Sequence, residues 1–548
     1  MSWLKTIQTH IAYWHARGVF SRFRRGLLDV SSTQARTLQR VLRLVSPSDY
    51  GRRLGLERVR TPAEFARAAP LVSYEDLRPV IEEVMAGRSE ALFARGTRLH
   101  MFATSSGTTA KSKFIPVTTE FIRDYRRGWN TFGLKMLMDH RGAFGRQILQ
   151  VTGRHDESVS ASGLPCGAIT GLLARLQKGI VRKFYVGRPD IVQVSDPSAR
   201  YYTLMRFGID QDLGFAITAN PSTLIRLARI VDAESETMVR DVHDGTLSSR
   251  LVPDDALRLR LQQYLRADPR RARELEQFRA ARGRLIPADY WHTRFLACWT
   301  GGSMSHYLPT VADLWGSLPV RDIGLLASEG RVTIPLADGS PIGVLDASGA
   351  FFEFIPLEQR EADRPDVLRA EQIEPGHDYV VVLTNTAGLI RYRLDDVVRM
   401  HGRFLGAPQL EFLYRAGRVS SLAGEKLTEN QVVQAVETVR RELGIEPFDF
   451  VLAPRWGDPP YYRVTVSRQI PNFSQLLDLA LCQVNDEYAS RRKSFRINEL
   501  AVRLAAPAAF RAYDQAQLTQ RGSTPEQYKR SYLFTQIDAD EIIAASDS

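Results

Sequence analysis

The stretch TSSGTTAKSK, residues 104–113, places hydroxyl side chains around one glycine and ends on two lysines. The preceding RLHMFATSSG has the pattern of a strand, and the following VTTEFIRDYRRGWNTFGLKMLM predicts a helix. Backbone N–H groups of such a loop between strand and helix form a concavity that binds anions. A lysine there adds a mobile positive charge. The stretch therefore predicts a phosphate-binding loop with Lys113 as its cation.

Two interpretations of this loop stay open on its own evidence. It lacks the second glycine of the GxxxxGK[ST] phosphate loop, so it could equally be an ordinary polar turn. Lysine is scarce in the chain, where only nine of the 73 basic residues are Lys. Two lysines in one short loop therefore give slight support to the phosphate interpretation.

Length and charge limit the class of protein. A chain of 548 residues is too long for one core and predicts two to four domains. The net charge of +11 fits either a polyanionic partner or anionic small substrates. Because the arginines are scattered among acids without a long run of one sign, we expect small substrates and no nucleic acid.

The order of predicted elements gives an α/β fold with at least two sheets. Strands alternate with helices up to about residue 290, and strands with glycine turns dominate from residue 292. Strands and helices mix again after residue 418, which predicts a small α+β domain. We therefore expect a large domain over residues 1–417 and a small one over 418–548, joined by a short hinge near residues 415–418.

The N-terminus and the cysteines bear on location. No apolar run is long enough for a secretory signal or a membrane span. Three separate cysteines without a CxxC pair indicate a reducing, cytoplasmic compartment, and Cys166 and Cys298 are expected to be packed small hydrophobes. Apolar residues with helical spacing predict an N-terminal helix that lies either on a membrane surface or on the protein's own core. These residues are Trp3, Ile7, Ile11, Trp14 and Phe20.

A second stretch with suitable chemistry is GLLASEG, residues 324–330. It follows a predicted strand and presents Glu329 after small residues. A carboxylate in such a place can hold Mg²⁺ against phosphate oxygens. Taken alone, the same pattern also fits a simple turn or helix cap.

A third stretch is IRYRLDDVVRM, residues 390–400, which places Asp395 and Asp396 in an apolar and basic strand region. An acid there can accept hydrogen bonds from the vicinal hydroxyls of a ribose. It can equally pair with Arg391 or Arg393. Three stretches suited to phosphate, Mg²⁺ and ribose, in this order, together favour a nucleotide site.

With these three motifs the chain resembles the adenylate-forming enzymes, and within them the Gretchen Hagen 3 (GH3) family of acyl-acid amido synthetases. The resemblance covers some 450 residues. It includes PLVSYEDLRPVIEEVMAG (70–87), TGGSMSHYLPTV (300–311), GAPQLEFLYRAGRVSSLAGEKLTEN (406–430) and STPEQYKRS (523–531). It implies a large multi-sheet adenylate-forming domain and a small mobile domain that rotates about the hinge.

The resemblance also implies roles for individual residues. Lys529 of the C-terminal EQYK is expected to stabilise the adenylation transition state, together with Lys113 and with Glu329 on Mg²⁺. Packing is the default expectation for His306 and Tyr307, and a substrate-facing role for one of them is the alternative. The implied ATP-binding residues are Ser105, Ser106, Gly107, Thr108, Thr109, Lys113, Ala327, Ser328, Asp396, Arg415 and Lys426. For Lys426 a structural role is equally open.

The sequence departs from the family pattern at a few positions. Ala110 and Ser112 stand where relatives often carry Gly and Pro, and Leu325 stands where plant members have Tyr. Asp395 replaces the usual Gly before the ribose aspartate. None of these changes removes a charged catalytic group, so they bear on nucleotide affinity more than on reaction type.

The implied reaction uses ATP and Mg²⁺ to activate a carboxylic acid as an acyl-adenylate. The acyl group then passes to an amine, expected to be an amino acid, to give an amide. One alternative is an acyl-coenzyme A ligase that forms a thioester. Another is a non-catalytic nucleotide- or acyl-binding relative. The sequence leaves the acid, the acceptor and the oligomeric state undetermined.

Overall fold

The structure is a computed structural model of the whole chain, and it describes most residues between 3 and 545. The described ranges are 3–105, 113–177, 179–415, 419–423, 425–521 and 528–545. Within them, the side chains of residues 3–12, 105, 180, 303, 306, 521, 544 and 545 are not described. Four residues of the predicted phosphate loop, Ser106, Gly107, Thr108 and Thr109, therefore lie outside the described residues, as do residues 416–418 of the predicted hinge.

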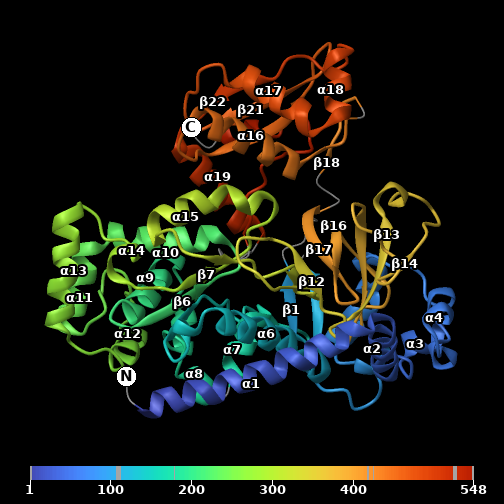
Figure 1. The fold of residues 1–548 in the computed structure, drawn as a ribbon, viewed down its shortest axis with the longest axis horizontal. Helices are drawn as coiled ribbons and strands as arrows, with labels where there is room; N and C mark the ends of the chain where they lie inside the picture. Colours follow the sequence, from blue (N-terminus) through green and yellow to red (C-terminus); the bar gives the residue numbers. More distant parts are fainter. Residues whose placement is uncertain are drawn as a thin grey trace.

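A seven-stranded antiparallel sheet forms one side of the large unit, in the order β11-β12-β17-β16-β15-β13-β14 (Figure 1). Helices from the start of the chain cover it, and the apolar face of α2 packs on β13 in the largest core cluster. The strands are β11 (Thr333–Pro335), β12 (Gly343–Leu345), β13 (Phe351–Pro356), β14 (Leu368–Arg369), β15 (Asp378–Thr384), β16 (Tyr392–Phe404) and β17 (Ala407–Arg415). The helices are α1 (Trp3–Leu28), α2 (Val30–Val45), α3 (Asp49–Arg53), α4 (Pro62–Ala68) and α5 (Tyr74–Met85).

A second sheet has four parallel strands in the order β3-β6-β7-β8. The strand β6 is buried along its whole length, as parallel strands covered by helices are. The strands are β3 (Gln147–Gln150), β6 (Leu213–Ile217), β7 (Phe295–Ala297) and β8 (Val320–Arg321). Helices around it are α6 (Thr119–Asp139), α9 (Pro197–Gly208), α10 (Pro221–Ala233), α11 (Ser235–Asp244), α12 (Asp255–Gln262), α13 (Pro269–Arg282), α14 (Pro287–Tyr290) and α15 (Leu308–Trp315).

The third sheet of the large unit corrects one expectation. The chain does not pass directly from the phosphate-loop stretch into a helix, because a strand, β2 (Lys113–Thr118), first pairs antiparallel with β1 (Leu99–Ser105). Ile115 and Val117 of β2 are fully buried, so core packing draws this segment into the sheet. Thr118 then caps α6. The remaining strands are β4 (Ser158–Val159) and β5 (Pro165–Gly167), the two short helices after them are α7 (Ile169–Arg175) and α8 (Gly179–Arg182), and the hairpin β9 (Leu326–Ala327) and β10 (Gly330–Arg331) stands apart.

The chain after β17 forms a smaller unit, orange to red in Figure 1, above the large one. It has a hydrophobic core of its own, in which α16 and α17 pack on the sheet β20-β21-β22. Thr428 caps α16. The elements are β18 (Val419–Ser420), β19 (Leu427–Thr428), α16 (Glu429–Leu443), β20 (Phe450–Arg455), β21 (Tyr461–Val466), α17 (Phe473–Val484), α18 (Asp486–Lys493), β22 (Ala501–Leu504), α19 (Pro507–Arg521) and α20 (Glu541–Ala545).

Both ends of the chain pack on the rest of the molecule. The described side chains of α1 include buried Ala16 and Leu27, and α1 runs along α6 (Figure 1). The last acidic segment is folded as far as α20. Asp540 is fully buried against Arg455 and Arg463, which anchors this segment to the small unit.

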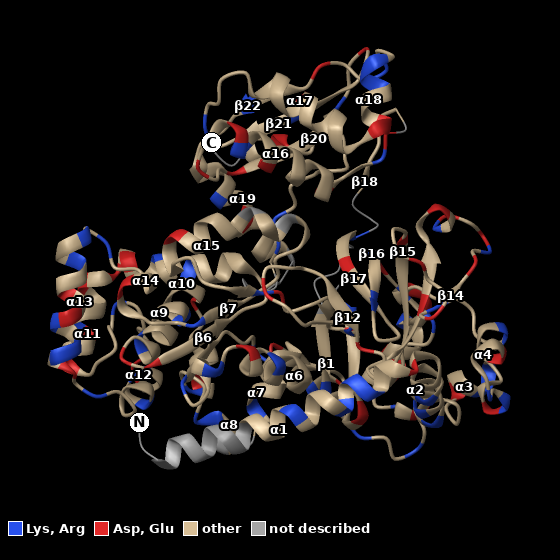
Figure 2. Cartoon of the chain, viewed as in Figure 1, with Lys and Arg blue, Asp and Glu red and all other residues tan. Residues whose placement is uncertain are grey.

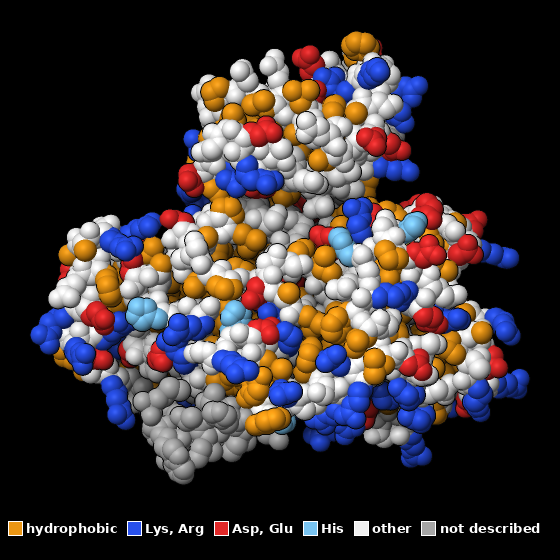
Figure 3. Space-filling view, viewed as in Figure 1, with side chains coloured by type: hydrophobic (Ala, Val, Ile, Leu, Met, Phe, Trp, Pro, Cys, Tyr) orange, Lys and Arg blue, Asp and Glu red, His pale blue; other side chains and the backbone are white. Residues whose placement is uncertain are grey.

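No described helix is long and apolar enough to cross a membrane. Basic side chains surround the outline of the molecule with acidic ones among them (Figures 2 and 3). The prediction for the cysteines is confirmed at the two buried positions: Cys166 and Cys298 are almost fully buried and unpaired. Burial raises the pKa of both thiols, so neither is an activated nucleophile.

Candidate functional site

A cavity of about 350 Å³ lies between the large and small units. Residues of all three sheets of the large unit line it, and the small unit contributes Glu429, Asn430, Tyr528 and Lys529. A volume of this size suits a small organic ligand. The cavity brings together both predicted acidic positions, Glu329 and Asp396, with Arg415 and the C-terminal Lys529.

The floor of the cavity follows from the parallel sheet. Gln150, Ile217, Trp299 and Asp322 line it, and each stands at or just beyond the carboxyl end of one parallel strand. Ligands of open α/β sheets bind at this edge because the loops that leave the strands diverge there. The four strands therefore place four side chains, distant in sequence, around one space.

One part of the lining, which we call the apolar half, carries no free charge. Its members come from α6, from the start of α7, and from the ends of the parallel strands and the loops that leave them, and several lie in or against one hydrophobic cluster. The buried carboxylate of Asp322 accepts hydrogen bonds from Thr300 and from the backbone of Gly324, so it serves to hold two loops. The apolar half consists of Tyr125, Trp129, Val151, Ile169, Ile217, Ala219, Ile323 and Leu325.

The other part, the polar half, consists of Ser328, Glu329, Asp396, Arg415 and Lys529. Glu329 and Asp396 are 3% and 7% exposed. Burial raises the pKa of Asp396 to about 6, and Arg415 and Lys529 oppose this shift while Glu329 adds to it. The Arg415 guanidinium lies 3.9 Å from the Asp396 carboxylate. Two carboxylates and two cations thus share a desolvated space. Their charges offset one another, but the contact between Arg415 and Asp396 is too long for a tight ion pair.

Lys113 reaches this polar half through a tyrosine. Its ammonium donates to the Tyr392 hydroxyl at 3.0 Å, and that hydroxyl lies 3.5 Å from Glu329 Oε1. Burial lowers the pKa of Lys113, and Glu329 opposes this shift. The rings of Tyr74 and Tyr392 flank the ammonium at 5.5 and 5.7 Å. The chain from Lys113 through Tyr392 thus links the end of the phosphate-loop stretch to Glu329.

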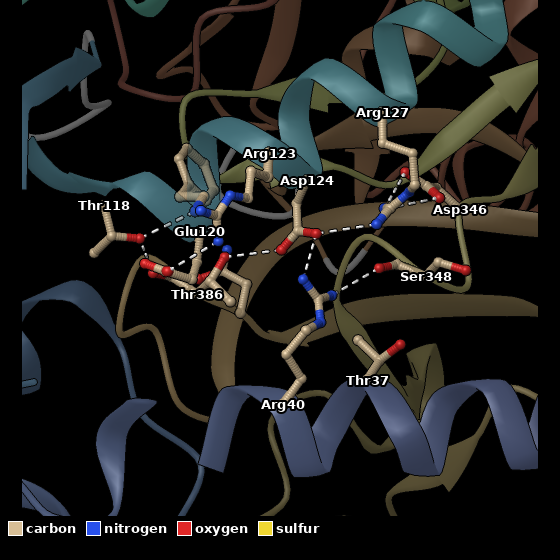
Figure 4. A network of polar contacts seen from close by, with 12 residues as sticks. Thr37, Arg40, Thr118, Glu120, Arg123, Asp124, Arg127, Asp346, Ser348 and Thr386 are labelled. Carbon is tan, nitrogen blue, oxygen red and sulfur yellow. Dashed lines mark hydrogen bonds and ion pairs between the residues drawn. The ribbon is translucent and has the colours of Figure 1, made fainter. Parts of the chain in front are cut away.

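A buried polar network around Asp124 holds Thr386 in the turn that follows β15 (Figure 4). Asn385 donates to the Glu329 carbonyl, and its neighbour Thr386 donates to Asp124 at 2.9 Å. Asp124 also binds Arg40 and Arg127, which ties α2, α6 and the 384–386 turn together. The backbone of Glu329 is therefore positioned by groups on rigid helices.

The structure separates the two interpretations of the acidic pair. Arg391 pairs with Glu353, with both side chains buried, and does not neutralise Asp396. Asp395 lies 3.7 Å from Arg393 and does not line the cavity. Asp396 alone faces the cavity, beside Arg415.

Two predicted residues lie elsewhere. Lys426 is exposed and does not line this cavity, because Glu425, bound by the backbone of Leu422 and Ala423, fixes the loop that carries it on the small unit. The Tyr307 ring packs against Tyr532 in the contact between the two units. The structure therefore does not place Tyr307 toward this cavity.

The remaining predicted residues are partly described. The Ser105 backbone ends β1, while its side chain and that of His306 are outside the described residues. Ala327 and Ser328 line the cavity, and the Ser328 hydroxyl donates to the Thr104 carbonyl at 3.1 Å. The second motif therefore lies directly beside the strand that leads into the phosphate-loop stretch.

Sequence reasoning missed Tyr392, Asn385 and Trp299. A signal existed for Tyr392, which stands four residues before Asp396 in a strand, where alternate residues share a face. Trp299 stands two residues after the short buried strand β7, and nothing in the sequence separates it from an ordinary core tryptophan. Asn385 acts through the backbone of Glu329, and nothing in the sequence pairs these two positions.

No group of three or more His, Cys, Asp or Glu suited to a metal ion occurs among the described residues. Mg²⁺ is commonly held by one or two carboxylates together with phosphate oxygens and water. The buried carboxylate of Glu329 in the polar half fits that kind of site. A purely protein-built metal cage does not fit the described residues.

Comparisons with known proteins cover nearly the whole chain. Three family models match it, described as the GH3 family N-terminal domain over residues 19–320, the central domain over 343–415 and the C-terminal domain over 430–536. Similar curated proteins include the jasmonoyl–L-amino acid synthetase JAR6 of Nicotiana attenuata, 27% identical and covering 88% of this chain and 87% of its own. The indole-3-acetic acid-amido synthetase GH3.2 of Arabidopsis thaliana is 26% identical, and the match covers 75% of this chain and 78% of that protein.

A solved structure, AtGH3.15 acyl acid amido synthetase in complex with 2,4-DB, matches with a TM-score of 0.83 over 97% of this chain and 96% of that one. The two sequences are 20% identical. The match shows a shared fold. It agrees with the multi-sheet α/β architecture expected from the sequence.

Proposed function

Because this chain belongs to the GH3 family, we propose that it is an acyl-acid amido synthetase that uses ATP to join a carboxylic acid to an amine. Its similar proteins are named for joining an acid to an amino acid, so an amino acid is the proposed acceptor. The observation that carries the proposal is the convergence of Glu329, Asp396, Arg415 and Lys529 on one cavity with an apolar half.

In the first step, a carboxylate oxygen of the acid attacks the α-phosphorus of ATP. The bond to the β-phosphate breaks, and pyrophosphate leaves with its electrons. Both reactants are anionic, so the ammonium groups of Lys529 and Lys113 lower the repulsion between them. Asp396 accepts hydrogen bonds from the ribose, and the apolar half takes the body of the acid and excludes water.

Mg²⁺, when bound, would neutralise phosphate charge, and Glu329 is the residue that fits it. The rigid support of Glu329 by Asn385 keeps this carboxylate in place without reorganisation. Ser105, Ser106, Gly107, Thr108 and Thr109 are proposed to contact the phosphates. This loop role rests on the family resemblance and on the chemistry of the sequence.

In the second step, the amine nitrogen attacks the acyl carbon, AMP leaves, and the amine loses a proton. We propose that the small domain, residues 418–548, rotates about residues 415–418 between the two steps. The separate core of that unit supports this movement. Such a rotation would move Lys529 out of the cavity and bring Lys426, which is exposed in this structure, toward the nucleotide. The unpaired cysteines suit a reducing compartment, and we propose a cytoplasmic location.

The test is pyrophosphate release with ATP, Mg²⁺ and pools of aryl and aliphatic acids, with and without amino acids. We expect release that depends on an acid, rises with an amino acid and falls at least 100-fold in Lys529→Ala. Lys493→Ala, at an exposed position on α18, is the matched control and should act as wild type. Release that responds only to coenzyme A would identify a thioester-forming ligase, and ATP binding without release a non-catalytic relative.

A further inference from the structure

The ammonium of Lys529 lies against the face of an indole. Its Nζ is 3.6 Å from the ring centroid of Trp299. Cations interact with aromatic faces out to about 6 Å, and the attraction grows when the pair is removed from water. Lys113, the other lysine of the site, lies 5.5 Å or more from its two flanking rings. The Lys529 contact is therefore close.

Hydrogen bonds hold both the indole of Trp299 and the backbone that carries it. The Trp299 backbone N–H donates to the Ala219 carbonyl at 3.0 Å, and the indole Nε1 donates to the Gly324 carbonyl at 2.9 Å. The next residue, Thr300, donates its N–H and hydroxyl to Asp322, which also accepts from the Gly324 N–H. The loops that follow β6, β7 and β8 thus fix the plane of the ring.

The segment that carries Lys529 is anchored on both sides of the lysine. The Tyr528 carbonyl accepts from Asn220 of the large unit at 2.9 Å. On the other side, the Tyr532 N–H donates to Glu429 at 2.6 Å. These contacts set the backbone of the segment. They leave the end of a long, flexible lysine side chain to be placed by whatever it touches in the cavity.

We propose that Trp299 is the positioning residue for Lys529, and that its indole face holds the ammonium at the junction of the two halves before ATP binds. The inference rests on the proposed function for its catalytic consequence. Trp299 packs against the hydrophobic cluster beside the apolar half, while Lys529 acts on Asp396 in the polar half. A lysine already held at this junction loses no further side-chain freedom when the reaction starts.

The kinetic test is a double-mutant cycle on acid-dependent pyrophosphate release at saturating ATP and acid. Trp299→Phe keeps an aromatic face and should stay within about threefold of wild type. Trp299→Leu removes the face and should lower kcat about 10- to 30-fold. In the Lys529→Ala background, Trp299→Leu should lower kcat by less than twofold, because the ammonium that the indole contacts is already absent. An equal cost in both backgrounds, or a change confined to the KM of the acid, would make Trp299 a wall for the substrate and overturn the proposal.

A second test needs no catalytic activity. The nucleotide-free protein is treated with an amine-acetylating reagent, and modification of Lys529 is measured by mass spectrometry relative to the exposed Lys493. We expect several-fold faster modification of Lys529 in Trp299→Leu, or in Trp299→Met if the leucine variant does not fold, and near wild-type rates in Trp299→Phe. Unchanged rates in these variants would refute the contact.

The control for general loosening is Trp315→Leu. Trp315 is another buried indole, and it donates to the Leu224 carbonyl at 3.0 Å outside the cavity. Trp315→Leu should leave the rate of Lys529 modification unchanged. If that rate rose as much as in Trp299→Leu, the effect of Trp299→Leu would be general destabilisation. A wild type that releases no pyrophosphate but shields Lys529 would reject the proposed function and leave this contact standing.

Discussion

The two halves of the cavity differ in how their residues are distributed along the chain. The polar half comes from short motifs in which a charged group stands among glycines, small residues or strand residues. The apolar half collects ordinary core residue types from α6 and from the ends of strands that are up to 170 residues apart. A charged residue indicates its chemistry by its type alone. An apolar residue that lines a cavity can be recognised only when its neighbours in space are known. The class of reaction can therefore be predicted from the polar half, whereas the identity of the acid depends on the apolar half.

The largest effect should come from Glu329→Gln. The amide keeps the shape of the side chain but loses the charge that fits Mg²⁺, so we expect pyrophosphate release to fall about 100- to 1,000-fold. Titration with Mg²⁺ should also show a higher requirement for the cation. Glu358→Gln, at an exposed position, is the control. Near-normal release by the Glu329 variant would remove this residue from the metal site.

Asp396→Asn should act on ATP more than on the acid. Loss of a charged acceptor for the ribose should raise the KM of ATP about 30-fold and leave the KM of the acid nearly unchanged. Steady-state kinetics with each substrate varied in turn measures both values. Equal changes in both constants would mean that Asp396 supports the whole cavity and not the nucleotide alone.

The same variant has a predicted effect on stability. Burial raises the folded-state pKa of Asp396 to about 6, above its ordinary 3.8, so its contribution to stability is lost as the pH rises through about 6. At pH 7.5 the ionised wild type carries this cost and the asparagine does not. We expect Asp396→Asn to raise the free energy of unfolding by about 1 to 3 kcal/mol at pH 7.5 and not below pH 4. Urea denaturation at both pH values measures it; a less stable variant at pH 7.5 would show that the attraction of Arg415 dominates.

Ile217→Val tests the apolar half. The change removes one methylene at the end of β6, where the body of the acid is proposed to lie. We expect selectivity between acids that differ by one methylene to change about fivefold, with the KM of ATP unaltered. Competition between two such acids, followed by mass spectrometry of the amides, reports this ratio. A shift in ATP affinity without a shift in acid preference would contradict the division into two halves.

Much of the fold could be predicted from sequence periodicity, and the failures have local causes. The strand β2 was not predicted because it is short and runs directly into the helix α6. Its buried residues, Ile115 and Val117, stand just before Thr118, which caps that helix. Residues 472–492 form two helices instead of one continuous helix, since Asn485 accepts from the Tyr488 N–H and starts the second. A tail of acidic residues looks frayed until the arginines that bury Asp540 are known. For β2 and for the tail the deciding partner lies outside the segment, whereas the break between α17 and α18 comes from Asn485 inside it.

The same division applies to the site. Glu329, Asp396, Arg415 and Lys529 could be named in advance, because each stands in a motif of the resemblance, and the structure brings all four to one cavity. Trp299 could not be distinguished from a core tryptophan such as Trp315. Trp299 stands two residues after β7 and Trp315 ends α15, and both donate their indole N–H to a backbone carbonyl. Only the position of Lys529, more than 200 residues away, separates them.

The smallest expected effect comes from Asp395, at the edge of the polar half. Its φ is +60°, the left-handed region, which explains why the resemblance leads us to expect a glycine here. Aspartate tolerates this conformation better than other side chains with a Cβ, so the departure from glycine costs little. Asp395→Ala should therefore lower the free energy of unfolding by about 1 kcal/mol, while Asp395→Gly should change it by less than about 0.5 kcal/mol.

Both variants should release pyrophosphate within about twofold of wild type, because the Asp395 side chain does not line the cavity and its pair with Arg393 is partly exposed. Thermal denaturation and kcat, measured on the same preparations, separate backbone conformation from charge. If the glycine variant lost activity tenfold while remaining stable, the Asp395 carboxylate would act on the nucleotide at a distance. The polar half would then extend beyond the residues that line it, and its boundary would be set by electrostatics instead of contact.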